Sequence, residues 1–141
     1  MDISSVMTPD PKRCMRSTLL SDVARLMRDE DVGQIPVVED GDSGKLAGVV
    51  TDRDIVVRAI ADGADPSRTK AEDCMSAPAV TIAVDASLED CARSMASAQV
   101  RRIPVVDEDG VLCGIVSQAD VQVTDARSLK EEIADRVSIP H

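Results

Sequence analysis

Thr51 and Asp54 place a hydroxyl and a carboxylate three residues apart, directly after the apolar run at residues 46–50. A helix starting after Thr51 would present unpaired backbone N–H groups and the positive end of its dipole, which attract phosphate. The Arg53 guanidinium would add a charge-assisted hydrogen bond to the same anion. The spacing is also that of a helix-capping pair, and for two residues taken alone capping is the commoner role.

This arrangement occurs twice in the chain. Ile35-Pro-Val-Val returns 68 residues later as Ile103-Pro-Val-Val. Gly48-Val-Val-Thr is matched by Gly114-Ile-Val-Ser, and Asp54 by Asp120. A repeat of this period indicates one supersecondary unit present in two copies.

Each copy predicts the order strand, helix, strand, strand, helix, which makes the fold class α+β with helices packed on three-stranded sheets. The strands are expected at residues 13–16, 35–38 and 46–50, and again at 80–84, 103–106 and 111–116. Ser87 is expected to cap the first helix of the second copy, with Asp90 completing a capping box. The second helix of the first copy is expected to run from Thr51 to about Gly63.

These elements divide the chain into a first motif at residues 1–63, a linker at 64–73 and a second motif at 74–124. The tail at residues 125–141 carries apolar residues at four-residue spacing, which predicts a short closing helix.

The amino-acid composition argues against some classes of function. The formal net charge of −10 argues against nucleic acid as a partner, because phosphate contacts need a basic surface. With no Phe, Tyr or Trp, the chain has no base-stacking platform, so aliphatic side chains would have to hold any nucleobase. The sequence shows neither a membrane span nor a secretory signal, which predicts a cytoplasmic protein.

The four cysteines are predicted to be core residues. Each stands where the other copy has an apolar residue, and free cysteine packs as a small hydrophobe. They are Cys14, Cys74, Cys91 and Cys113. The one histidine is the terminal His141, and no Cys-x-x-Cys spacing occurs, so no metal site is expected.

The whole pattern resembles the cystathionine-β-synthase-type (CBS) domain family over residues 3–124. The resemblance rests on Val6-Met-Thr and Cys74-Met-Ser, on the two Ile-Pro-Val-Val strands, and on the runs from Gly48 to Asp54 and from Gly114 to Asp120. It implies two motifs related by a pseudo-two-fold axis, a unit called a Bateman module. Members commonly pair into a disk-like homodimer and usually sense adenosine-containing ligands.

The resemblance also implies two ligand sites. In the first, Asp54 would bind the ribose and Thr51 the phosphate, while the adenine would lie against residues 8–14 and the second copy would supply two arginines. The full expected set is Thr51, Arg53, Asp54, Arg101, Arg102, Ile35, Pro36 and Cys14.

The second expected site comprises Ser117, Asp120, Val80, Ile82, Ile103 and Pro104, within reach of residues 76–82. It should bind phosphate more weakly, because the positions matching Arg101 and Arg102 are the uncharged Gly33 and Gln34.

No catalytic residue or cofactor is expected, since the chain has no Walker-type loop and no histidine to act as a base beside a nucleophile. The leading interpretation is a regulatory module that binds an adenine nucleotide and signals to an effector protein. The alternative is a structural or interaction protein whose sites are degenerate and empty. A metal or redox sensor built on the cysteines is a third, disfavoured interpretation.

Overall fold

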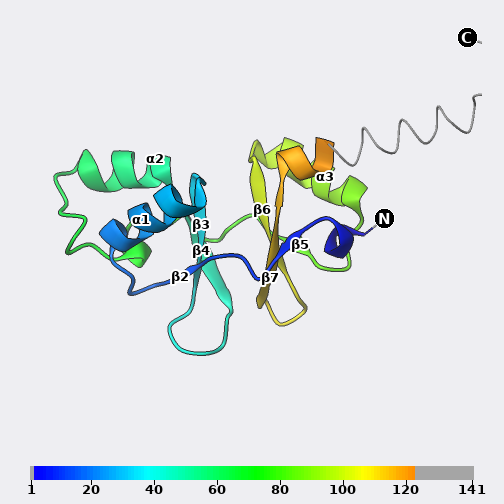
Figure 1. Cartoon of the computed structure of the whole chain (residues 1–141), viewed down its shortest axis with the longest axis horizontal. Coiled ribbons are helices and arrows are strands. Elements are labelled where there is room, and N and C mark those ends of the chain that lie inside the picture. The colour runs from blue at the N-terminus through cyan, green and yellow to red at the C-terminus, as the bar shows by residue number, and fades with distance from the viewer. Residues whose placement is uncertain (1, 123–141) are drawn as a thin grey trace, which may run out of the picture.

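The computed structural model describes residues 2–122, which form two α+β halves of like topology lying side by side (Figure 1). The predicted tail helix and His141 lie outside these residues. The first half contains β2 (Cys14–Met15), α1 (Leu20–Glu30), β3 (Gln34–Val38), β4 (Leu46–Thr51), α2 (Asp52–Asp54) and its continuation η2 (Ile55–Ile60).

The second half repeats this order. It contains β5 (Ile82–Ala83), α3 (Leu88–Ala98), β6 (Arg102–Val106) and β7 (Leu112–Ser117), and residues 118–122 are helical. Each predicted strand lies within two residues of an observed one.

The two sheets pair their strands alike, but they differ in size. β2 is parallel and β4 antiparallel to β3, and β5 and β7 flank β6 in the same way. The second sheet gains a fourth strand, β1 (Thr8–Pro9), which pairs antiparallel with β7 and aligns Thr8 with Ile115. The prediction of three strands in each sheet is therefore corrected for the second half.

This fourth strand is part of an exchange in which the segment that precedes each repeat packs against the other repeat. The first leading segment, residues 3–9, includes η1 (Ile3–Ser5) and packs Ile3, with no exposed surface, into the core of the second half. The second leading segment, residues 71–77, includes η3 (Ala71–Asp73) and packs Ala71 and Cys74 into the core of the first half. Figure 1 shows the dark blue first leading segment against the second half.

Glycine permits this exchange. A Cβ on Gly48 would lie 2.6 Å from the backbone oxygen of Ser76, and one on Gly114 would lie 2.8 Å from that of Thr8. Val49 meanwhile exchanges backbone hydrogen bonds of 2.8 and 3.1 Å with Ser76. The leading segments therefore lie directly on the repeat-related glycines.

Each core is built from one helix face and the central strands. α1 contributes Leu20, Val23 and Met27, and α3 contributes the matching Leu88, Cys91 and Met95. Ile35, Pro36, Val37 and Val38 of β3 are all buried, so both faces of this strand are covered. Continuous burial explains why β3 lacks the alternating pattern of a half-exposed strand.

The helix ends are satisfied in different ways. Ser87 caps α3 by accepting a 3.0 Å hydrogen bond from the Asp90 N–H, as predicted. The Asp90 carboxylate does not complete the predicted box and instead lies 3.5 Å from Arg93. The linker carbonyls of Thr69 and Pro66 accept from the first N–H groups of α1 at 2.8 and 3.0 Å.

The helix after Thr51 begins where predicted but winds more loosely. Residues Ile55–Ile60 form a π-helix in which the Ala61 N–H donates to Val56, five residues back, at 2.9 Å. It ends before Gly63, which has φ +78°, as predicted. Between residues 2 and 122, no helix has the length and apolar character needed to cross a lipid bilayer.

Candidate functional site

Thr51 and Asp54 form a complete capping box. The Thr51 hydroxyl accepts a 3.0 Å hydrogen bond from the Asp54 N–H, and Asp54 Oδ2 accepts one of 3.0 Å from the Thr51 N–H. Ser117 and Asp120 make the same two hydrogen bonds, at 3.1 and 3.0 Å. The capping interpretation is therefore confirmed in both repeats, and it leaves open whether these residues also bind a ligand.

The Asp54 carboxylate is held by further groups. The residue is only 8% exposed, and the Ser76 hydroxyl donates to its two oxygens at 3.2 and 3.3 Å. Arg58 Nε lies 3.7 Å from Asp54 Oδ1, and the Arg58 guanidinium also donates to the backbone oxygen of Met75 at 3.2 Å. Asp54 thus joins the start of α2 to the second leading segment.

This placement differs from the expected first site. The sequence interpretation put residues 8–14 beside Asp54, but the structure puts Ser76 there and pairs Thr8 with β7 instead. The exchange of leading segments is the physical reason. Ser76 and Arg58 were missed, although the alignment of Ser76 with Thr8 was a signal for the first of them.

A cleft between the repeats collects several expected residues on one surface. This inter-repeat cleft has a volume of about 430 Å³. Its lining residues are Thr8, Asp10, Pro11, Lys12, Glu30, Val32, Gln34, Ile35, Pro36, Arg102 and Ile115. Residues from 8 to 12 thus lie with Ile35, Pro36 and Arg102, the grouping expected for the first site, but Thr51 and Asp54 do not line this cleft.

The charges of the inter-repeat cleft are unevenly paired. Asp10 lies 3.0 Å from the Arg13 guanidinium, which neutralises it. Lys12 and Arg102 have no ion pair or side-chain hydrogen bond to any residue between 2 and 122, and Glu30 has none there either. The lining of the cleft therefore combines two unpaired cations and one unpaired anion with aliphatic side chains.

The remaining residues of the expected first site lie elsewhere. Arg101 is exposed and lines a separate hollow with Met95 and Gln118, because neighbouring residues at the start of a strand point to opposite faces. Arg53 is also exposed, and its backbone N–H donates to Asp52 at 2.8 Å. Neither guanidinium lines the inter-repeat cleft.

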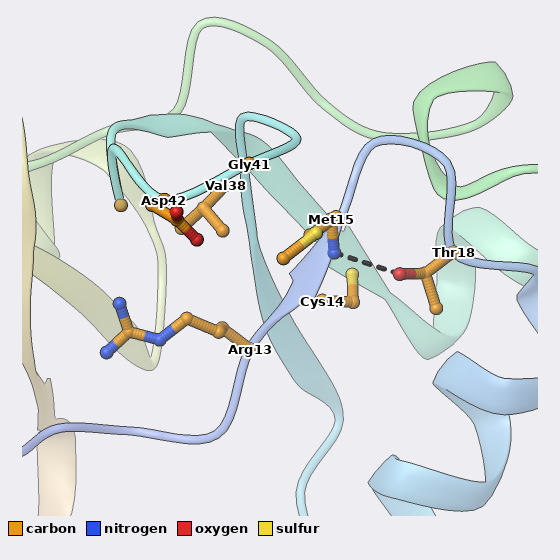
Figure 2. Close-up of a pocket in the computed structure, with 8 residues that line it drawn as sticks. Arg13, Cys14, Met15, Thr18, Val38, Gly41 and Asp42 are labelled. Carbon is orange, nitrogen blue, oxygen red and sulfur yellow. Dashed lines mark hydrogen bonds between the residues drawn. The ribbon is translucent and has the colours of Figure 1, made fainter.

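Cys14 lies in the core of the first half and beside a third hollow. This hollow has a volume of about 410 Å³, and Figure 2 shows the Met15 side chain directed toward Val38 across it, with Cys14 beside Met15. Burial raises the pKa of the Cys14 thiol to about 12, with a smaller contribution from the nearby Cys74. Cys14 does not line the inter-repeat cleft.

The other cysteines also pack as the sequence predicts. Cys74 and Cys91 are buried, and Cys113 is half-buried against the second core. All four are free thiols, and burial raises the pKa of Cys74 and Cys91. Among residues 2–122 no three metal-ligating side chains come together.

The expected second site is spread over β5, β6 and the start of the last helix. Ile103 and Pro104 are buried on β6, Ile82 is half-buried on β5, and Val80 is 44% exposed. Ser117 and Asp120 lie at the end of β7 in the capping pair described above.

The sequence matches the family described as CBS domain over residues 3–60 and 71–122. CBS domain-containing protein YhcV of Bacillus subtilis is 38% identical over 121 residues, which is 86% of this chain and 83% of that relative. The uncharacterised protein MK0525 of Methanopyrus kandleri is 32% identical over 71% of this chain, and the match spans 50% of its own length.

Solved structures share the fold. Hypoxic response protein I with two coordinated zinc ions has 31% identity and a TM-score of 0.79, covering 86% of this chain and 97% of that one. CBSX2 in complex with AMP has 28% identity and a TM-score of 0.76, with 92% and 98% coverage. The cytosolic domain of the Mg²⁺ channel MgtE in complex with ATP has 33% identity and a TM-score of 0.73, with 87% and 48% coverage.

Proposed function

Because this chain belongs to the CBS-domain family, we propose that it binds an adenosine-containing nucleotide and regulates a partner protein rather than catalysing a reaction. The observation that carries the proposal is the inter-repeat cleft, where the unpaired cations Lys12 and Arg102 flank an apolar floor. The AMP bound to CBSX2 and the ATP bound to the MgtE domain support this ligand class.

The lining of the cleft suits the two ends of such a ligand. Its volume of about 430 Å³ lies in the range of small-molecule sites, which are largely apolar with a few polar groups. Ile35, Pro36 and Ile115 offer aliphatic surface to a purine, which needs no aromatic side chain. Lys12 and Arg102 offer charge-assisted hydrogen bonds to phosphate.

The Asp54 site is the second place for a ligand in this proposal. Its helix start keeps the exposed Arg53 guanidinium, but the N–H groups of residues 52–54, expected to be unpaired, already donate within the protein. The Asp54 carboxylate also already accepts from Thr51 and Ser76, so a ribose hydroxyl would compete with these donors for its oxygens. We therefore place the tighter site at the inter-repeat cleft, whose cations have no such competitor.

Calorimetry with AMP and adenosine tests the proposal. Lys12→Met and Arg102→Met should each weaken AMP about ten- to hundred-fold, since hydrogen bonds to charged groups contribute about 1.5–3 kcal/mol, and should leave adenosine nearly unchanged. Arg68→Met is the matched control, because the Arg68 side chain is 86% exposed and lies 3.9 Å from Asp65, outside the cleft.

Two results would redirect the proposal. If Asp54→Ala abolishes AMP binding while both cleft variants bind as wild type does, the Asp54 site is the tighter one. If the wild-type protein binds none of AMP, ATP, S-adenosylmethionine or adenosine, the structural or interaction role replaces the nucleotide sensor.

One observation favours that interaction role as a second function. Val56, Val57 and Ile60 on η2 are 58%, 47% and 48% exposed, and such an apolar surface is typical of a contact site. We propose that this η2 face joins two copies into a homodimer and that the assembly presents the ligand state to an effector protein. The four free thiols agree with a reducing compartment such as the cytoplasm.

A further inference from the structure

Gln34 differs from the other polar residues of the inter-repeat cleft in having a buried side-chain atom without a hydrogen-bond partner. It begins β3, where it aligns with Thr51, and it lines the cleft. Its Oε1 atom is buried and has no hydrogen-bond partner, and no other side-chain nitrogen or oxygen between residues 2 and 122 is in this state. A buried acceptor without a donor destabilises the empty protein.

The position has a charged counterpart on the same surface. Gln34 and Arg102 occupy equivalent places in the two repeats, and both line the inter-repeat cleft. A neutral acceptor and a guanidinium thus face the same volume. Phosphate oxygens can pair with the guanidinium but offer no donor to Gln34 Oε1, whereas a hydroxyl or amino group offers one.

On the basis of the proposed function, we propose that Gln34 is a specificity-determining residue that accepts a hydrogen bond from a neutral donor of the nucleoside, a ribose hydroxyl or the purine amino group. The terminal torsion of glutamine is soft, so the amide turns toward a ligand at little cost and exchanges an unpaired position for a paired one. The ligand is thereby oriented with its neutral donor at Gln34 and its phosphate at Lys12 and Arg102.

The test uses adenosine, so that phosphate charge does not enter the comparison. Gln34→Met keeps the length of the side chain and removes the acceptor, and it should weaken adenosine about tenfold. Gln34→Glu keeps the acceptor oxygens and should hold adenosine within about threefold of wild type, since no ligand charge opposes the new carboxylate. Gln118→Met is the matched control, because Gln118 is exposed and lines a different hollow.

Analogues identify the donor. Purine riboside lacks the amino group, and 2′-deoxyadenosine and 3′-deoxyadenosine each lack one hydroxyl. The effect of Gln34→Met should disappear for the one analogue without the donor that Gln34 accepts from, and persist for the other two. In the absence of ligand, Gln34→Met should also raise Tm by about 3 °C, because it removes an unsatisfied buried group.

The inference is overturned if Gln34→Met binds adenosine within twofold of wild type, or if Gln34→Glu weakens adenosine as much as Gln34→Met does. A Tm of ligand-free Gln34→Met below that of wild type would also contradict the inference. These outcomes leave the proposed function intact as long as wild-type protein binds adenosine and AMP. If wild-type protein binds neither, the proposed function itself fails.

Discussion

At the scale of single residues, the Asp54 carboxylate stabilises the fold through contacts within the protein alone. It accepts from the Thr51 N–H and the Ser76 hydroxyl, and it lies 3.7 Å from Arg58. The sequence predicts the first contact, because capping depends on residues three apart. It cannot predict the Ser76 contact, which depends on where the second leading segment lies, whereas Arg58 stands four residues after Asp54, a spacing from which the ion pair could have been predicted.

Cys14 leads to a prediction about pH. Burial raises its pKa from the ordinary 9.0 to about 12, so the folded protein retains a proton that the unfolded chain loses above pH 9. This contribution to stability is complete below pH 9 and declines as the pH rises toward about 12. We expect the urea midpoint to fall as the pH rises above about 9 toward 12, and to fall less in Cys14→Val.

Cys113→Val is the control for this measurement, because Cys113 is only half-buried and lies in the other half of the molecule. An unchanged pH dependence in Cys14→Val would show that other groups, such as lysines, cause the decline.

At the scale of elements, strands and helices follow the sequence closely where their own residues determine them. Ser87 starts α3, Gly63 follows the end of η2, and both Ile-Pro-Val-Val segments are central strands. The two-residue strand β1 was missed, because it is too short for a hydrophobic period and its partner Ile115 lies more than 100 residues away. The missed strand also explains the misplaced half of the first ligand site.

Gly48 offers a test of how closely the elements approach. A Cβ at this position would lie 2.6 Å from the Ser76 backbone oxygen, which is held by a 3.1 Å hydrogen bond from the Val49 N–H. Gly48→Ala should therefore lower the free energy of unfolding by about 1–3 kcal/mol, as overpacking does. Urea denaturation measures the change.

Ala47→Gly, one residue earlier on β4, reports the generic effect of exchanging these two residue types on that strand. A Gly48→Ala variant within about 0.5 kcal/mol of wild type, the usual range for surface changes, would show that the second leading segment is free to shift.

At the scale of the whole molecule, the η2 face predicts the state of assembly. The chain has a mass of 15.0 kDa, so a homodimer should sediment at about 30 kDa at micromolar concentration. Val57→Asp should shift the protein to the monomer, because a buried unpaired charge at an interface is costly.

Val80→Asp is the matched control, since Val80 is 44% exposed and precedes β5 rather than belonging to η2. If the wild-type protein is a monomer, or if the Val57→Asp variant remains a dimer, the η2 face is not the interface.

The exchange of leading segments also sets an order of events during synthesis. Ile3 leaves the ribosome well before Leu88, Ile103 and Val116, which its burial requires and which are made about a hundred residues later. At about 5–20 residues per second, translation separates these partners by about 5–20 s. Throughout that interval the nascent chain carries the first leading segment, with Ile3, without the second core that buries it. Chaperone engagement should therefore concentrate on residues 3–9 and end when β7 emerges.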